Sequence, residues 1–303
     1  MSRILEDQIS SNRKKSYVLL ILVPALLFLL IYFVGEIFFG SMYISLGGIP
    51  FNAFWFFGIL IALGYTVLSY FKSDEMVLKA VGAEKADREK YDDLYDMVES
   101  LAIGSGMPMP DLYIQEEESI NAFATGRKPD DGKICVTTGA LRKLDDQELE
   151  GVLAHELSHI QNHDVLFMTL VVALVGAISM LSYILLRGSI FGGATRSRRR
   201  EGGGILILIG LVFAILAPIA AKLTQLAISR KREFLADSSG AHLTRYPEGL
   251  ASALEKIGRD SGKMDVNDAV SPLYIANPFK GKGKALLSTH PPLEERIKRL
   301  REM

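Results

Sequence analysis

Two histidines and a glutamate near the middle of the chain have the spacing of a metal-dependent hydrolase. The stretch 154–160 reads Ala-His-Glu-Leu-Ser-His-Ile, so His155 and His159 are four residues apart and Glu156 follows the first. Residues four apart on an α-helix project from one face, so both imidazoles can bind one ion. A catalytic zinc ion needs such neutral ligands, an open position for water, and a carboxylate that takes the proton of that water. The competing interpretation is a surface helix with two solvated histidines.

The residues around this motif favour the metal site. Apolar side chains line one side of the expected helix, and acidic residues precede it, where the helix dipole favours negative charge. The apolar residues are Leu149, Val152, Leu153, Leu157 and Ile160, and the acidic ones are Asp145, Asp146 and Glu148. We therefore predict one zinc ion (Zn2+) per chain, with His155 and His159 as ligands and Glu156 as the general base.

A second acidic pair downstream can complete the ligand set. Glu233 and Asp237 are again four residues apart. Glu233 would give a set of two histidines and one glutamate, which is the ligand set of one class of catalytic zinc sites. Asp237, one turn further on, can accept the free N–H of a ligating histidine and fix its tautomer. Small residues in the same stretch would let two helices approach closely; they are Ala236, Ser238, Ser239, Gly240 and Ala241.

The composition indicates a membrane protein. The chain has 303 residues, of which 49% are hydrophobic, and a mean hydropathy of +0.22. Soluble domains are rarely this apolar, and four apolar runs are long enough to be membrane helices. They are Tyr17 to Val34, Phe51 to Phe71, Val165 to Leu186 and Ile205 to Ala221. The formal net charge of −1 gives no electrostatic case for nucleic acid as a partner.

The distribution of Lys and Arg predicts the orientation of the first two membrane helices. Arg13, Lys14 and Lys15 precede the first run, Lys72 follows the second, and the connection 35–50 has neither residue type. Positive residues favour the cytoplasmic side, so both ends of this helical hairpin should lie there. The second pair of runs stays open, because its connecting loop is rich in arginine. The number of crossings between His159 and Glu233 must nevertheless be even.

The remaining sequence predicts a small sheet and further helices. Segments 111–115, 121–126 and 133–137 have strand character, and a Pro-Asp-Asp-Gly turn should join the last two into a hairpin. The single cysteine, Cys135, lies in the last strand and is expected to be a buried thiol. Pro291 and Pro292 would hold His290 in a defined place. The helix 293–301 is expected to dock on the surface.

We therefore predict a mainly α integral membrane protein, with about four apolar helices and a zincin-like metalloprotease domain that contains a small β-sheet. The expected parts are an N-terminal transmembrane hairpin (1–72), a first catalytic part (73–164), a second apolar helix pair (165–226), and a second catalytic part with the third ligand (227–303).

The chain resembles the HtpX-type membrane metalloproteases, relatives of the CAAX prenyl proteases, over nearly its whole length. The motifs that carry the resemblance are Asn-Ala-Phe-Ala-Thr-Gly at 121–126, the His155 to His159 motif, 230–237 and Ser-Thr-His-Pro-Pro at 288–292. The resemblance implies that His155, His159 and Glu233 bind zinc, that Glu156 is the catalytic base, and that Asp237 supports a ligand.

The same resemblance implies a substrate site and a cellular role. It makes the stretch 121–125 (Asn121, Ala122, Phe123, Ala124 and Thr125) an edge strand that binds extended substrate by strand addition. It also makes His290 a second catalytic residue that stabilises the oxyanion. Relatives of this kind cleave membrane proteins, often misfolded, so the expected partners are membrane-protein or unfolded polypeptide substrates and the lipid bilayer. The expected location is the cell inner or plasma membrane, multi-pass, with the active site facing the cytoplasm, in quality control or stress response.

Three alternatives remain open. A CAAX-type prenyl-peptide protease would use the same chemistry, although such proteins are generally longer. A membrane-anchored chaperone with structural zinc would need a fourth protein ligand. A transporter with a metal in its pathway would show internal repeats and broken helices, which the sequence lacks.

Overall fold

The computed structural model describes residues 40–172, 229–260, 264, 270–276 and 291–303, together with parts of 10–36 and 174–178. The predicted apolar run 205–221, the arginine-rich loop before it, and His290 lie outside the described residues. The run from Val165 is described only in its first part. Our expectations about those segments therefore stay predictions.

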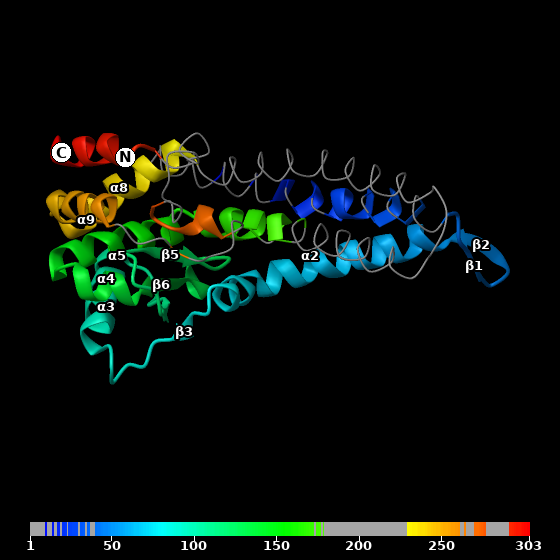
Figure 1. The fold of residues 1–303 in the computed structure, drawn as a ribbon, viewed down its shortest axis with the longest axis horizontal. Coiled ribbons are helices and arrows are strands. Elements are labelled where there is room, and N and C mark those ends of the chain that lie inside the picture. Colours follow the sequence, from blue (N-terminus) through cyan, green and yellow to red (C-terminus); the bar gives the residue numbers. More distant parts are fainter. Residues whose placement is uncertain are drawn as a thin grey trace, which may run out of the picture.

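A long apolar helix connects the two ends of the molecule (Figure 1). Helix α2 (Ala53–Ala80) is the one helix in the described part of the chain that is long and apolar enough to cross a membrane. Asn52 caps it by accepting hydrogen bonds from the backbone N–H groups of Phe54 and Trp55 at 2.9 and 3.1 Å. The predicted membrane run ended at Phe71, but α2 continues for more than two further turns. It therefore reaches the sheet directly.

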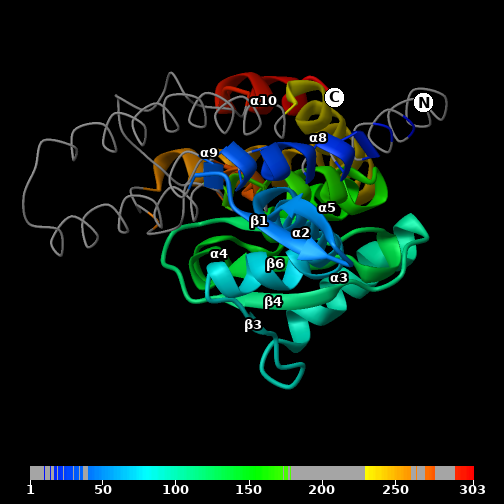
Figure 2. The same cartoon turned by 90° about the vertical axis from the view of Figure 1, so that its right-hand side faces the viewer.

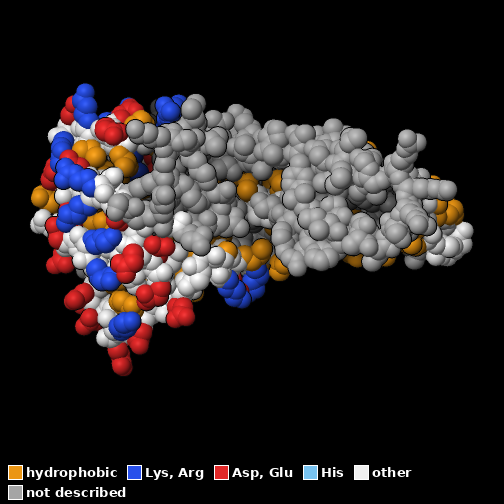
Figure 3. Space-filling view, in the orientation of Figure 1, with side chains coloured by type: hydrophobic (Ala, Val, Ile, Leu, Met, Phe, Trp, Pro, Cys, Tyr) orange, Lys and Arg blue, Asp and Glu red, His pale blue; other side chains and the backbone are white. Residues whose placement is uncertain are grey.

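Two shorter apolar helices, Leu20–Phe33 and Asp164–Gly176, pack against α2. Their contact is an apolar cluster that joins Leu27, Ala62 and Leu170 among other side chains. At the far end, strands β1 (Tyr43–Leu46) and β2 (Ile49–Asn52) form a hairpin whose turn, Gly47 and Gly48, has positive φ at both residues. In Figure 3 the charged side chains gather at the opposite end, over the sheet and its helices.

A four-stranded sheet begins where α2 ends. Its strands are β3 (Glu84–Lys85), β4 (Asp111–Gln115), β5 (Ala122–Thr125) and β6 (Lys133–Thr137), in the order β3-β4-β6-β5. The hairpin of β5 and β6 is antiparallel as predicted, with the turn η1 (Pro129–Asp131) between them. The sequence did not indicate that β4 pairs with β6 in parallel, nor that β3 forms at all. Strand β5 is an edge strand.

Side chains alternate between two apolar clusters on the two faces of the sheet. Ala122 and Ala124 of β5 point into the main core with α3 (Asp92–Ser105) and α5 (Asp146–Gln161). Phe123 and Cys135 point to the other face, where Val77 of α2 packs. Burial raises the pKa of the Cys135 thiol, as expected for a structural cysteine. The strand β5 is thus fixed between the catalytic helix and the end of the membrane helix.

Four further described helices lie with α3 and α5 at the end that carries the sheet (Figure 2). They are α4 (Thr138–Lys143), α8 (Arg230–Thr244), α9 (Pro247–Arg259) and α10 (Leu293–Arg301). The predicted acidic start of α5 is a capping box in which Asp145 and Glu148 bond each other's backbone N–H groups. Glu148 also accepts hydrogen bonds from Ser252 and Lys256 of α9 at 2.6 and 2.5 Å. These bonds fix the N-terminus of the helix that carries both histidines.

Candidate metal centre

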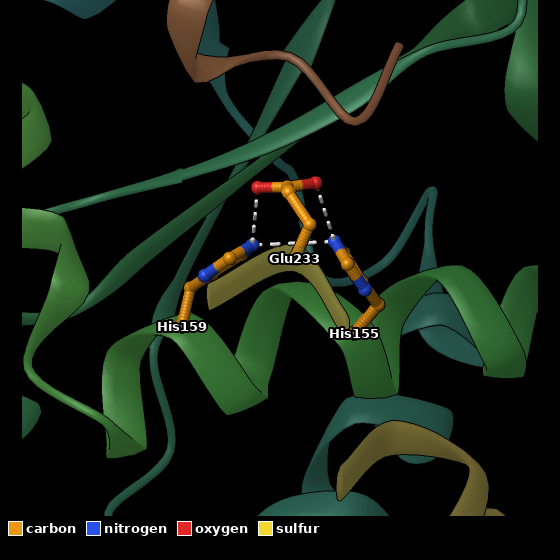
Figure 4. A group of neighbouring side chains, drawn as sticks. All are labelled: His155, His159 and Glu233. Carbon is orange, nitrogen blue, oxygen red and sulfur yellow. Dashed lines mark hydrogen bonds and ion pairs between the residues drawn. The ribbon is translucent and has the colours of Figure 1, made fainter. Parts of the chain in front are cut away.

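Three side chains from two helices converge on one point (Figure 4). His155 and His159 project from the same face of α5, and their Nε2 atoms are 3.2 Å apart. Glu233, from the first turn of α8, faces both: its two carboxylate oxygens lie 3.9 Å from Nε2 of His155 and 3.7 Å from Nε2 of His159. All three side chains are buried. The predicted ligands therefore lie together.

The close crossing of α5 and α8 depends on a glycine. A Cβ atom at Gly240 would be 3.0 Å from the backbone nitrogen of His155 and 3.1 Å from the carbonyl carbon of Ala154. Ala236, one turn before Gly240 on α8, is fully buried. Small residues thus bring the two helix axes close enough for Glu233 to reach the histidines, as the sequence suggested.

The geometry of these donors fits a metal ion. Zinc in protein sites is tetrahedral, with bonds of about 2.0–2.2 Å to nitrogen and oxygen, so its ligand atoms are separated by roughly 3.3 Å. The separations of 3.2, 3.7 and 3.9 Å lie near this value. Two imidazoles and one carboxylate suit zinc and several other first-row metals. Within the described residues the cluster contains these three candidate ligands.

Each histidine is held from behind by an aspartate. Asp237 Oδ1 lies 3.0 Å from Nδ1 of His155, and Asp164 Oδ2 lies 3.1 Å from Nδ1 of His159. These contacts direct both Nε2 atoms toward the centre. The sequence suggested Asp237 for this position but gave Asp164 no function. Asp164 reaches back because His163 adopts a positive φ of 56° directly after α5, a turn that the sequence did not reveal.

Glu156 is the buried acid of the site. In the described structure neither of its carboxylate oxygens makes a well-formed hydrogen bond, although the carboxylate interacts with the backbone of Ala124 in β5. Burial, the largest effect, raises the pKa of Glu156 to about 7, and the charge of Glu233 adds to the shift. A buried carboxylate with a raised pKa in this position is suited to accept a proton from a water molecule.

The pKa values of the two histidines shift in opposite directions in the metal-free protein. Burial lowers the pKa of His155, and its contact with Asp237 offsets only part of that effect. Burial also disfavours the charged form of His159, but Asp164, Glu233 and Glu156 outweigh it and raise the pKa to about 9. The negative charge around His159 therefore favours positive charge at this point of the site.

Arg296 is a member of this site that the sequence analysis missed. It lies on α10, and its side chain is completely buried. Its guanidinium donates two hydrogen bonds to Asp237, at 2.9 and 2.7 Å, and one to the backbone oxygen of Ile275 at 2.9 Å. Its Nη1 atom is also 3.6 Å from Glu233 Oε2. Helix α10 is thus part of the site, and not merely a helix docked on the surface.

The charge of Arg296 also keeps Asp237 ionised. Burial by itself raises the pKa of Asp237, but Arg296 and His155 outweigh it and hold that pKa below its usual value. Arg296, Asp237 and His155 therefore form a connected chain of charged and polar groups that ends at the metal centre.

Comparison with known proteins identifies the family. The profile of Peptidase family M48 matches residues 88–303. The chain belongs to peptidase family M48. A protease HtpX homolog from Thermoanaerobacter pseudethanolicus is 44% identical and covers 97% of this chain and 96% of its own length. A homolog from Streptococcus pneumoniae is 43% identical, covering 99% of this chain and 100% of its own length.

A solved structure shows a more distant likeness. The crystal structure of S. mikatae Ste24p aligns with a TM-score of 0.49 and 19% sequence identity, over 97% of this chain and 66% of that chain. The matches of the profile and of the HtpX homologs confirm the predicted resemblance. The M48 chain is therefore a membrane-bound metallopeptidase.

The expected substrate strand of this M48 peptidase borders the metal site, but its side chains are not free. All five residues from Asn121 to Thr125 are buried. The ring of Phe123 packs edge-on against Tyr274, with their centroids 5.1 Å apart. The hydroxyl of Thr125 is 3.1 Å from that of Thr169. Phe123 and Thr125 must therefore contact any substrate through their backbone, and the roles assigned to these residues and to His290 stay predictions.

Proposed function

We propose that this M48 peptidase is a zinc-dependent endopeptidase. The observation that carries the proposal is the buried carboxylate of Glu156, which has no well-formed hydrogen bond and stands beside three converging ligand side chains. His155, His159 and Glu233 would hold the ion. Zinc bound there would act as a Lewis acid that polarises a substrate carbonyl and makes water more acidic.

The protein side chains supply the proton transfers. Glu156 removes a proton from the water that attacks the scissile carbonyl, and it later delivers that proton to the leaving amine. Asp237 and Asp164 keep the two histidine rings in one orientation during this cycle. His290 is assigned to the oxyanion on the strength of the motif that it shares with the family.

The substrates we propose are membrane proteins or unfolded polypeptides, cut at the cytoplasmic face of the cell membrane. The position of the site supports this assignment. Helix α2, the candidate membrane span, ends in the apolar cluster that also contains Phe123 of β5. This contact supports a metal centre near the membrane surface, where polypeptide that leaves the bilayer would be within reach. A role in quality control or stress response follows from this substrate class.

A chaperone with structural zinc is the main alternative from a different functional class. A closed structural site takes four protein ligands. Within the described residues the cluster contains three, and Cys135 is buried on the far face of the sheet. A prenyl-peptide protease would share the same catalytic residues and differ only in substrate.

The test combines metal content with proteolysis of an unfolded membrane-protein reporter in detergent. Wild type should bind one zinc ion and cleave the reporter. Glu156→Gln should keep zinc but lose at least roughly 100-fold in rate, because a general base contributes about that much. Glu233→Ala should lose the metal. Glu150→Gln, on the same helix, is the control and should behave as wild type. Cleavage by Glu156→Gln at the wild-type rate would show that the assignment is wrong.

A further inference from the structure

The outer edge of β5 presents two peptide groups to the active site. The N–H of Thr137 in β6 bonds the backbone oxygen of Asn121 at 3.1 Å. Because the hydrogen-bonding direction alternates along an antiparallel strand, Phe123 and Thr125 also face β6. The peptide groups of Ala122 and Ala124 therefore face outward. An extended polypeptide that adds to this edge would pair with these two residues.

One of these two peptide groups is already occupied by the chain itself. The segment Ser271–Ala276 (brown in Figure 4), which we call the strap, runs past the edge of β5. The N–H of Ile275 donates to the oxygen of Ala122 at 3.0 Å. The Nδ2 atom of Asn121 donates to the oxygen of Ala276 at 3.2 Å. The strap thus takes the place of an added strand.

The backbone oxygen of Ile275 is also bound, by a group of the metal centre. Arg296 Nη1 donates to it at 2.9 Å, and the same guanidinium bonds Asp237 behind His155. Both polar groups of the Ile275 backbone are therefore held, one by the edge strand and the other by the arginine. The Ile275 side chain is 2% exposed and packs into the main apolar core.

Ile275 lies close to Glu156, the proposed general base, along the edge of β5. Glu156 lies on the backbone of Ala124, the next outward-facing residue of β5 after Ala122. Ile275 therefore pairs with β5 two residues before the point where the carboxylate of Glu156 lies. A substrate residue beside the scissile bond would have to occupy this place. Its main chain would meet Ala122 and Arg296, and that of the next residue would meet Asn121.

We infer that Asn121, Ala122 and Arg296 form a subsite for the main chain of two consecutive substrate residues, and that Ile275 and Ala276 fill this subsite in the resting enzyme. The inference rests on the proposed endopeptidase function and names its substrate requirement. An incoming strand displaces Ile275 and Ala276 and repeats their hydrogen bonds. Since the side chain of Ile275 lies in an apolar pocket, the substrate residue bound there is an aliphatic one.

The strap has a fixed point from which such an exchange can take place. Tyr274, directly before Ile275, packs its ring on Phe123 and donates a hydrogen bond from its hydroxyl to Gln115 at 2.8 Å. Tyr274 can stay in place while the two following residues leave the edge. The exchange replaces one set of hydrogen bonds and one buried aliphatic side chain with an equivalent set, so tightly bound substrate is not required.

The first test is kinetic and uses a substitution that weakens the binding of Ile275 to the subsite. Ile275→Ala keeps the N–H but removes most of the side chain, so a reporter peptide should bind with a KM several-fold lower and an almost unchanged kcat. The matched control is Ile257→Ala, which is 3% exposed in the same cluster but belongs to α9 and not to the strap. It should not lower KM. If Ile275→Ala loses kcat/KM as Ile257→Ala does, the strap is only a structural support and the inference is wrong.

A binding test without catalysis separates this inference from the proposed function. The probe is a labelled peptide with the sequence of residues 270–276, added to zinc-loaded Glu156→Gln protein. Fluorescence anisotropy should show at least 10-fold weaker binding when the isoleucine of the peptide is replaced by aspartate. Hydrogen exchange at the Ile275 amide should become faster when the peptide binds.

Equal affinity for both peptides, or unchanged exchange at the Ile275 amide, would refute the subsite even if the wild-type protein cleaves its reporter. If the peptide binds as expected but the wild-type protein does not cleave its reporter, only the endopeptidase assignment is wrong.

Discussion

Asp237 illustrates how a single side chain outside the ligand set controls the metal site. It bonds Nδ1 of His155 on one side and the Arg296 guanidinium on the other. Its charge therefore increases the basicity of the ligating histidine and also neutralises a buried arginine. Such partners of metal ligands typically change metal affinity by roughly 10–100-fold when they are altered.

We predict that Asp237→Asn lowers zinc affinity by roughly 10–100-fold. The amide keeps the shape of the side chain but removes the charge that holds His155 and pairs with Arg296. Competition with a chromophoric chelator would measure the effect. Asp96→Asn, at an exposed position on α3, is the control with the same change in charge. Unchanged zinc affinity in Asp237→Asn would show that His155 needs no such partner.

The metal ligands could be predicted from the sequence because the spacing within one helix determines which side chains share a face. The contact of Arg296 with the site could not be predicted in this way. Helix 293–301 has four basic residues, at 296, 298, 299 and 301, and only the packing of α10 on its neighbours selects the first of them for burial. Asp164 was missed for a related reason, since its contact depends on the left-handed turn at His163.

The crossing of α5 and α8 is the feature of the elements on which the ligand geometry depends. We predict that Gly240→Ala destabilises the protein by about 1–3 kcal/mol, as overpacked sites usually do. The new methyl group would meet the backbone of His155 and Ala154, which cannot rotate away. Because Glu233 moves with α8, zinc affinity should fall as well.

Gly104→Ala in α3 is the matched control for this change. Its methyl group would meet only the end of the Leu243 side chain, at 3.4 Å, which can adjust. Thermal unfolding and zinc titration of both variants would check the prediction. A Gly240→Ala protein with normal stability and normal metal affinity would mean that the helices can separate without moving the ligands.

The sheet shows which elements a sequence can and cannot reveal. The hairpin of β5 and β6 was predictable, because its strands are adjacent and a turn of Pro-Asp-Asp-Gly joins them. The parallel pairing of β4 with β6 was not, since it joins strands that are separated by β5. Strand β3 has two residues, too few for any periodic pattern. The strap along β5 has no strand pattern either, and only its contacts reveal it.

At the scale of the whole molecule, α2 links the membrane to the active site. Asp74, near its end, forms a buried ion pair with Lys133 of β6. Val77 and Leu78 follow and pack in the same apolar cluster as Phe123 and Tyr274. The sheet is therefore fixed to the membrane helix by both charge and apolar contacts. This attachment fixes the candidate membrane span to the sheet that borders the metal centre.

The orientation of α2 decides on which side of the membrane the metal centre lies. We predict that the β1–β2 hairpin is outside and α3 is in the cytoplasm, because the connection 35–50 has no Lys or Arg whereas Lys72 and Lys79 follow the apolar part of α2. Two exposed serines allow a matched labelling test of this orientation, with Ser45→Cys in β1 and Ser100→Cys in α3.

The native Cys135 should not react with the label, because it is buried and its thiol pKa is raised. A membrane-impermeant maleimide should label Ser45→Cys in intact cells and Ser100→Cys only after permeabilisation. The opposite pattern would place the peptidase on the outer face, where substrates and metal supply both differ.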